Sequence, residues 1–202
     1  MALNYHVSAD IVDIRSHRPK AGDTFLVDTN VWLWMSYTKV PPSVYQAELY
    51  PPFVNQAIKI KATLLRCGLS FAELSHSIER AERQIYIETH RMIGTKLFRH
   101  TRREERKTVV AEIKAAWGAV QTMATPLDVT IDEHITTASL ERLHTQPLDG
   151  YDLFIAEALE KSDTNQILTD DGDFCCIPGI CMFTANRNVI KAAASQGKLV
   201  NR

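Results

Sequence analysis

The sequence predicts an α/β fold, a three-layer sandwich in which helices cover both faces of a central parallel sheet of about four or five strands. Short apolar runs alternate with longer segments of helical period, which is the order of elements in such folds. Two of the apolar runs end in acids, one at Asp28 and one at Asp170 and Asp171. Because ligands bind at the carboxyl ends of parallel strands, we expect these acids at one edge of the sheet.

Strands are predicted where short runs are apolar or alternate in polarity. They cover residues 24–28, 127–131, 166–169 and 180–183. Apolar residues at helical spacing predict the helices. These cover residues 53–65, 70–91, 101–123, 132–143 and 148–159, with one more after Asp28 and one from Asn186. The pairs Pro41-Pro42 and Pro51-Pro52 predict a loop before residue 53.

The size and composition favour one domain rather than two. With 202 residues, 45% of them hydrophobic, the chain can bury a core without disulfides or a structural metal. We expect residues 24–202 to form the domain, with a long helical insertion around residues 75–125. Residues 1–23 would be an N-terminal arm or an added edge strand.

The cysteine pattern and hydropathy indicate a cytoplasmic location. The four cysteines include no C-x-x-C pair, so reduced thiols are the simplest interpretation. No apolar run approaches the ~18 residues that a membrane span needs, and no secretory signal is expected at the N-terminus. We therefore expect no membrane partner.

The charge distribution is uneven. The formal net charge is -1, but residues 80–107 carry nine Lys or Arg against four Asp or Glu, a local balance of +5. A basic segment beside an acidic remainder suits a metal-using enzyme that acts on a polyanion. A solvated helix face with ordinary charge fluctuation is the alternative.

Acidic residues recur at strand ends and helix starts. They are Asp28, Glu73, Asp149 with Asp152, and the run Asp170-Asp-Gly-Asp173. Each has a plain structural explanation, because helix N-termini favour anions and Asp with Gly favours turns. A parallel sheet, however, brings the ends of its strands and the starts of the helices that follow them to one edge.

Clustered carboxylates repel one another and raise one another's pKa, unless a cation lies between them. Mg²⁺ and Mn²⁺ prefer oxygen ligands and are usually held by a few carboxylates. One or two such ions would activate water and stabilise the charge that develops on a phosphodiester. The pattern therefore favours metal-dependent hydrolysis of a nucleic acid.

The order of the acidic motifs resembles the PIN-domain family of nucleases, including toxin ribonucleases of the VapC type. Phe25-Leu-Val-Asp28-Thr-Asn30 is similar to the first motif of that family, and Glu73 early in a helix to the second. The helix from Asp152 is similar to the third, and Leu168-Thr-Asp-Asp-Gly-Asp-Phe174 to the fourth. The likeness extends over about residues 24–190.

The resemblance implies roles for particular residues in a Mg²⁺- or Mn²⁺-dependent endoribonuclease. The catalytic and metal-binding set would be Asp28, Glu73, Asp152 and Asp171, with Asp173 and Asp149 as further metal ligands at the rim. Supporting residues would be Thr29, Asn30 and Thr169. The substrate would be RNA, cut without a covalent enzyme intermediate.

Two departures from compact family members affect the expected partners. The N-terminal arm and the long helices of residues 75–125 are additional to the compact pattern. A toxin role with an antitoxin protein as partner, and a homodimer, are therefore expectations separate from the nuclease chemistry.

The basic stretch offers a candidate surface for RNA phosphates. Its members are Arg99, Arg102, Arg103, Arg106 and Lys107. Beside the site they would give salt-sensitive, sequence-blind affinity. A solvated helix with Glu104 and Glu105 as counter-charges is the alternative.

Three other functions can be compared with the same motifs. A haloacid-dehalogenase-like phosphohydrolase would need a second Asp two residues after Asp28, where this chain has Asn30. A catalytically inactive PIN-like module for RNA binding or assembly would have no need of the four acids, which are all present. A calcium loop of the EF-hand type is excluded because Asp170-Asp-Gly-Asp173 lacks the alternating acids of such a loop.

Overall fold

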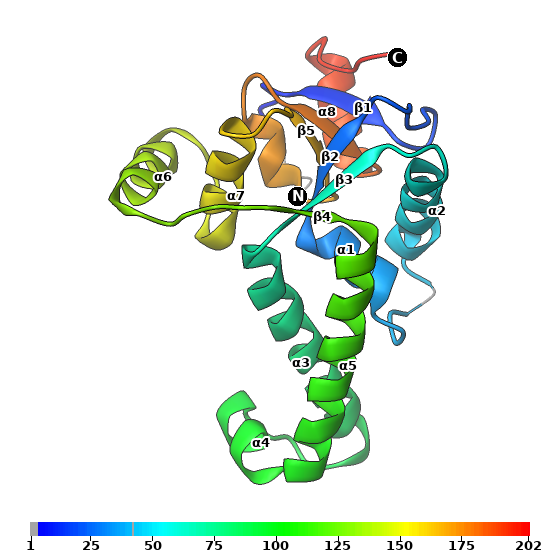
Figure 1. Ribbon diagram of the computed structural model, residues 1–202, viewed down its shortest axis with the longest axis vertical. Helices are drawn as coiled ribbons and strands as arrows, with labels where there is room; N and C mark the ends of the chain where they lie inside the picture. The colour runs from blue at the N-terminus through cyan, green and yellow to red at the C-terminus, as the bar shows by residue number, and fades with distance from the viewer. Residues whose placement is uncertain (1–3, 42) are drawn as a thin grey trace.

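The computed structural model describes residues 4–41 and 43–202 and confirms the α/β fold (Figure 1). Six parallel strands form a single sheet in the order β1-β6-β5-β2-β3-β4. The strands are β1 Asp10–Asp13, β2 Thr24–Val27, β3 Thr63–Cys67, β4 Thr125–Leu127, β5 Gln166–Leu168 and β6 Cys181–Thr184. The helices are α1 Thr29–Ser36, α2 Tyr45–Lys59, α3 Leu69–Thr89, α4 Thr95–Thr101, α5 Arg103–Met123, α6 Glu133–Thr145, α7 Gly150–Glu160 and α8 Arg187–Ser195, with a 3₁₀ turn η1 at Gly172–Cys176.

The order of the strands reverses beside β2. From β2 the chain proceeds to β3 and β4 on one side, and it then returns to β5 and β6 on the other. Phe25 and Leu26 pair with Gln166 and Ile167 of β5 in register. The carboxyl ends of β2 and β5 therefore form the topological switch point, where open α/β sheets bind their ligands.

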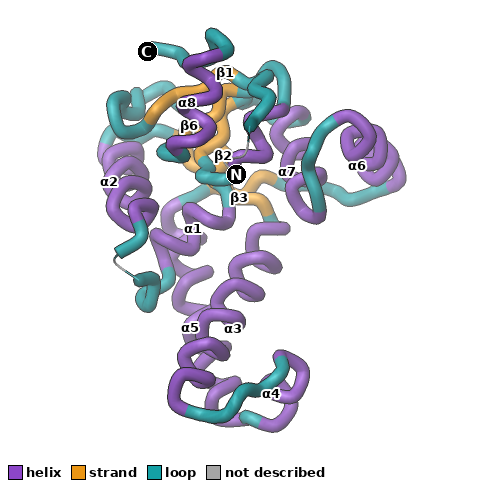
Figure 2. The backbone as a smooth tube through the Cα atoms, turned by 180° about the vertical axis from the view of Figure 1, so that it is seen from behind, coloured by secondary structure: helices purple, strands orange, loops and turns teal. Residues whose placement is uncertain are grey.

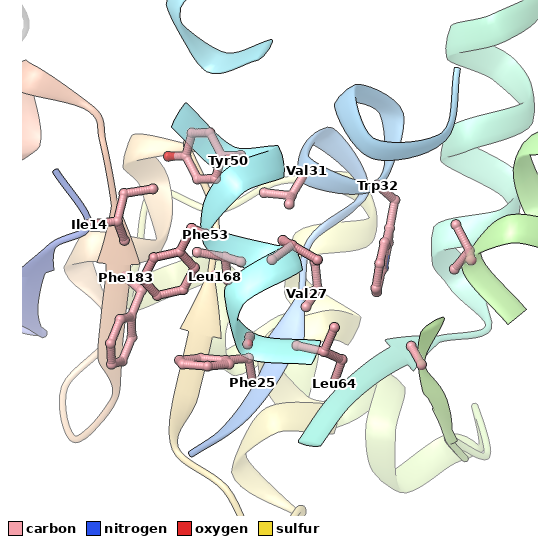
Figure 3. Close-up of a cluster of buried hydrophobic side chains, with 14 of the residues drawn as sticks. Ile14, Phe25, Val27, Val31, Trp32, Tyr50, Phe53, Leu64, Leu168 and Phe183 are labelled. Carbon is pink, nitrogen blue, oxygen red and sulfur yellow. The ribbon is translucent and has the colours of Figure 1, made fainter. Parts of the chain in front are cut away.

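Each face of the sheet has its own apolar core, because successive side chains of a strand point to opposite faces. On one face, Phe25 lies edge-on to Phe183 with ring centroids 4.8 Å apart, and Phe53 of α2 packs on both rings (Figure 3). On the other face, Leu26 and Ile167 pack with α7 and α8. Helices cover both faces, as the sandwich requires.

The long helical insertion forms an antiparallel hairpin of α3 and α5 that projects from the sheet, with α4 at its tip (Figures 1 and 2). A small separate core stabilises the tip, where Ile93, Phe98 and Val109 are buried together. The base of the hairpin lies under the sheet, since Glu73 near the start of α3 follows directly on β3. The base of the hairpin therefore lies near the predicted site, and its tip lies far from it.

The predictions were wrong between residues 45 and 67. The second helix starts at Tyr45 and continues through Pro51 and Pro52, where a loop was expected. Burial of Tyr50 and Phe53 against the sheet outweighs the low helix propensity of proline. The same helix ends at Lys59, whereas the predicted helix extended to residue 65. Residues 63–67 instead form the strand β3.

One edge strand differs from its prediction, and the other agrees with one of the two alternatives expected for residues 1–23. The strand expected at residues 127–131 lies at Thr125–Leu127 and includes Pro126, which an edge strand tolerates because one side of it is unpaired. The N-terminal segment supplies an added edge strand, β1, which pairs with β6. With β1 and β3, the sheet has six strands rather than four or five. None of the described helices is long and apolar enough to cross a membrane.

Candidate functional site

Asp28 lies at the switch point, directly after β2 and at the N-cap of α1. Its backbone N–H donates to the carbonyl oxygen of Leu168 (3.1 Å), so the ends of β2 and β5 are joined. Its Oδ1 accepts from the Thr29 N–H (2.6 Å), which satisfies one of the free N–H groups at the helix start. Only 5% of Asp28 is exposed.

Two side chains predicted to support Asp28 contact its second carboxylate oxygen. Asn30 Nδ2 donates to Asp28 Oδ2 (2.7 Å), and Thr169 Oγ1 donates to the same atom (2.6 Å). The Thr169 hydroxyl in turn accepts from the Asp171 N–H (2.9 Å). Thr169 therefore links the first acidic motif to the fourth.

Thr29 links the first motif to the second. Its hydroxyl donates to Glu73 Oε2 at 2.5 Å, while its N–H holds Asp28. Glu73 lies in the second turn of α3, which packs beside α1. A continuous set of hydrogen bonds thus connects Glu73, Asp28 and Asp171 through two threonines.

Asp152 approaches from the opposite face of the sheet, in the first turn of α7. Its pKa is raised to about 8, first by burial and then by the charges of Asp28, Asp171, Glu73 and Asp149, in that order. Asp149 is the N-cap residue of α7, but its side chain makes no capping hydrogen bond. The four predicted motifs therefore share one electrostatic environment.

The same environment acts on Asp28 and Glu73. The pKa of Asp28 is raised to about 7, mainly by burial and also by the charges of Glu73 and Asp171, while the hydrogen bond from Thr169 opposes the change. Burial and then Asp171 raise the pKa of Glu73, against the hydrogen bond from Thr29. Within residues 4–41 and 43–202, no Lys, Arg or His forms an ion pair with these carboxylates.

The donor set fits a hard cation in its chemistry. Beside the carboxylates, the amide oxygen of Asn30 is buried and has no hydrogen-bond partner, so a further oxygen at the site lacks a positive group. The side chains are not drawn together, however: over the described part of the chain, no group of three or more His, Cys, Asp or Glu is placed to hold a metal ion as it stands. Binding of an ion would require these side chains to move.

No protein family, curated protein or solved structure matches this chain. The site and the fold are therefore the observations from which a function can be inferred. Of these, the grouping of one buried and three partly buried acids around the switch point is the most informative, since carboxylates without a positive partner are costly to remove from water.

Sequence reasoning missed the residues that hold Asp170. Tyr45 and Tyr50 donate to its two carboxylate oxygens at 2.7 Å each, and Gln46 Nε2 donates at 3.0 Å. These donors come from α2, in the region expected to be a loop. Asp170 therefore accepts hydrogen bonds from three side chains of α2, whereas Asp171 accepts none from a side chain among the described residues.

Asp171 and Asp173 also have structural roles. Asp171 Oδ1 accepts from the Asp173 N–H (3.0 Å) and caps η1, so the expected turn chemistry is present at this position. Burial raises the pKa of Asp173, and the charges of Asp171 and Asp149 contribute. Asp173 thus belongs to the same group of interacting acids, at its rim.

The basic stretch does not lie beside the carboxylates. It occupies α4 and the start of α5, at the far end of the hairpin (Figure 1). Arg99 binds Glu79 through Nε (2.8 Å) and Nη2 (2.6 Å), and Arg106 lies 3.5 Å from the same carboxylate. Lys107 pairs with the exposed Glu104.

The remaining two basic residues differ from each other. The Arg102 guanidinium lies over the Tyr86 ring at 5.6 Å, and Arg103 is exposed. The five basic residues therefore do not form one free surface. Arg99, Arg106 and Lys107 lie in ion pairs, whereas Arg102 and Arg103 form none among the described residues.

The largest of the described hollows, about 920 Å³, lies elsewhere, between α6 and α7. Its wall includes Arg142, which pairs with Glu157 at 2.7 Å and also with Glu160. Its buried acid, Glu157, thus has a basic partner, unlike the buried Asp28 at the switch point. The hollow is the larger concave feature, but the acids at the switch point have strongly raised pKa values and no basic partner among the described residues. Perturbed pKa values are typical of functional sites, so the acids are the stronger candidate.

Proposed function

We propose that the protein is a divalent-metal-dependent endoribonuclease with a PIN-like active site. Asp28, Glu73, Asp152 and Asp171 would hold Mg²⁺ or Mn²⁺, one or two ions, and Asp149 and Asp173 would assist at the rim. The observation that carries the proposal is that acids from four separate elements interact electrostatically at the switch point and have no basic partner among the described residues; Asp28 is buried and the other three are partly buried.

The energetic reasoning concerns the ionised state of these acids. At neutral pH, burial and mutual repulsion hold Asp28 and Asp152 partly protonated. A divalent cation reverses this repulsion, which makes the site attractive to one. When bound, such an ion supplies activation of water and stabilisation of the charge on a phosphodiester.

The residues around Asp28 would orient the carboxylate for this purpose. Oδ1 is fixed by the Thr29 N–H and Oδ2 by Asn30 and Thr169, so the group cannot rotate freely. The Thr29 hydroxyl fixes Glu73 in the same way. These bonds orient the two carboxylates, and binding of an ion would require the other acids to move toward them.

RNA as the substrate rests on the PIN-like order of motifs and on the basic hairpin. A phosphohydrolase of the haloacid-dehalogenase type is less well supported, because Asn30 occupies the place of its general acid and donates to Asp28 through an amide, which cannot supply a proton. An inactive RNA-binding or assembly module remains the alternative to be tested.

The toxin role and the homodimer are proposals separate from the nuclease chemistry. A toxin role, with an antitoxin protein that covers the site, is tested by co-expression with the product of the adjacent gene. A homodimer is tested by analytical ultracentrifugation. Neither result would change the assignment of the carboxylates.

The direct test of the proposed function is RNA cleavage. Wild-type protein should cut a single-stranded RNA with Mg²⁺ or Mn²⁺ and not with EDTA. Asp171→Asn should lower the rate at least 100-fold, whereas Asp163→Asn, at an exposed acid far from the site, should leave it unchanged. Hydrolysis of a small phosphate ester at a comparable rate, or no metal dependence, would overturn the proposal.

A further inference from the structure

A second, smaller hollow of about 210 Å³ lies on α3, toward the tip of the hairpin. It is lined by His76, Glu79, Arg80, Arg83 and Thr95. Four of these come from α3, and Thr95 is the first residue of α4. The hollow is therefore part of the helical insertion and separate from the carboxylates.

The acid in this hollow is already neutralised. Glu79 accepts two hydrogen bonds from Arg99, and Arg106 lies 3.5 Å from it. Two arginines against one glutamate leave a surplus of positive charge before Arg80 and Arg83 are counted. The hollow thus has the electrostatics of an anion site.

The two remaining arginines differ in their freedom. Arg83 is held by a hydrogen bond from Nη1 to the carbonyl oxygen of Ile93 (3.0 Å), and its Nε is buried with no partner. Arg80 is exposed and, among the described residues, forms no ion pair. One donor is fixed and unsatisfied, and the other can adjust to a ligand.

The hollow lies on the same face of α3 as the predicted metal ligand Glu73. Positions 73, 76, 80 and 83 are separated by three, four and three residues, which places them within about a quarter of the helix circumference. At about 1.5 Å per residue, His76 to Arg83 lie roughly 5 to 15 Å from Glu73 along the axis. One helix face therefore leads from the acids to the basic hollow.

We propose that this hollow is a phosphate-binding subsite, which holds a backbone phosphate of the RNA about two to four nucleotides from the cleaved bond. The spacing follows from roughly 3.4 Å per phosphate along a stacked strand. Arginine guanidinium groups bind phosphate oxygens through paired hydrogen bonds, and a phosphate carries no sequence information. The subsite rests on the proposed function and adds to it a minimum substrate length.

The test measures RNA binding in a protein that cannot cut. Asp171→Asn protein with Mg²⁺ is titrated with a fluorescent 12-nucleotide single-stranded RNA at several salt concentrations. Adding Arg80→Gln should raise Kd about 3- to 10-fold and reduce the slope of log K against log salt by about 0.7, the value for one phosphate contact. His76→Gln should raise Kd less.

Lys59→Gln is the matched control. Lys59 is exposed, and it precedes β3, so it lies at the edge of the sheet opposite to the acids. Its removal takes away the same charge without touching the subsite. Equal Kd and salt slope for Arg80→Gln and Lys59→Gln, at equal melting temperatures, would overturn the proposal.

A cleavage assay distinguishes failure of this inference from failure of the proposed function. In the active protein, Arg80→Gln should raise KM for a 12-nucleotide RNA but not for a dinucleotide, which is too short to reach the hollow. Normal cleavage with an unchanged KM would refute the subsite alone. No cleavage by wild-type protein, with binding that still depends on Arg80, would refute the nuclease and retain the subsite. Binding of inorganic phosphate with unchanged RNA affinity would show an anion site that RNA does not use and would also refute it.

Discussion

Thr169 donates a hydrogen bond of 2.6 Å to Asp28, although 141 residues separate them in the sequence. The same hydroxyl accepts from the Asp171 N–H, so one side chain joins the ends of β2 and β5. Thr169 is fully buried, and water cannot replace these bonds without a rearrangement. The geometry of the proposed site therefore depends on a residue that holds no metal itself.

Replacing this hydroxyl tests that dependence. Thr169→Val keeps the shape but removes one of the two side-chain donors to Asp28 Oδ2 and the acceptor of the Asp171 N–H, so we expect a loss on the order of 1–3 kcal/mol in the free energy of unfolding. Thr169→Ser keeps the hydroxyl and should lose less. Chemical denaturation of both variants measures the difference, and equal losses would show that the hydroxyl is unimportant.

The pH dependence of stability follows from the raised pKa values. The pKa is about 7 for Asp28 and about 8 for Asp152 in the folded protein, against roughly 3.9 in an unfolded chain. The folded state thus binds these protons more tightly, and its stabilisation is complete below about pH 4 and is lost as the pH rises through 7 and 8.

In metal-free protein, we therefore expect unfolding to become easier between pH 5 and pH 8, by an amount on the order of 1–3 kcal/mol. Asp28→Asn should weaken this dependence, because an amide does not ionise and Asn30 can turn its free oxygen toward the new NH₂ group. Denaturation at a series of pH values is the measurement. A stability that rises over this range in the wild type would contradict the raised pKa values of Asp28 and Asp152.

Metal ions should stabilise the folded protein. Mg²⁺ or Mn²⁺ at millimolar concentration should raise Tm by a few degrees, since the ion binds only the assembled site. The shift should be larger at pH 8 than at pH 5, where protons compete for the carboxylates. Asp171→Asn should remove the shift and Asp163→Asn should not, as differential scanning fluorimetry would show. A shift of equal size in both variants would place the ion elsewhere.

The support of Asp170 can be tested with a matched pair of tyrosines. Tyr50 is fully buried, donates to Asp170 and accepts from the Ala185 N–H (2.9 Å), so Tyr50→Phe leaves two buried groups unsatisfied and should cost about 1–3 kcal/mol. Tyr45 makes one such bond from a half-buried position, and Tyr45→Phe should cost less. Equal costs in urea denaturation would argue against the described network.

The sequence was sufficient to place the acids on the fold because their positions follow from simple rules. Asp28 ends an apolar run that a sheet buries on both faces, and Asp152 lies in the first turn of a strongly apolar helix. The support of Asp28 by Asn30 and Thr169 was expected from the resemblance, and the structure shows both hydrogen bonds. Whether these acids bind metal remains a prediction.

Other features were outside the reach of sequence patterns. The helical period of residues 53–65 runs into β3, so the strand had no separate signal until its pairing with Thr24–Leu26 was seen. Pro51 and Pro52 favoured a loop, so the start of the helix that brings Tyr45 and Tyr50 to Asp170 was not predicted. The two long helices were predicted, but their pairing as a hairpin that projects from the sheet and places Arg99 far from the acids is a tertiary contact that local sequence does not show.

Anomalous diffraction from crystals grown with Mn²⁺ tests the central claim most directly. The account predicts a manganese peak bounded by Asp28, Asp152 and Asp171, and no such peak in the Asp171→Asn protein. A peak only at another place, or none at a concentration that supports cleavage of RNA, would contradict the assignment of these carboxylates as the metal site.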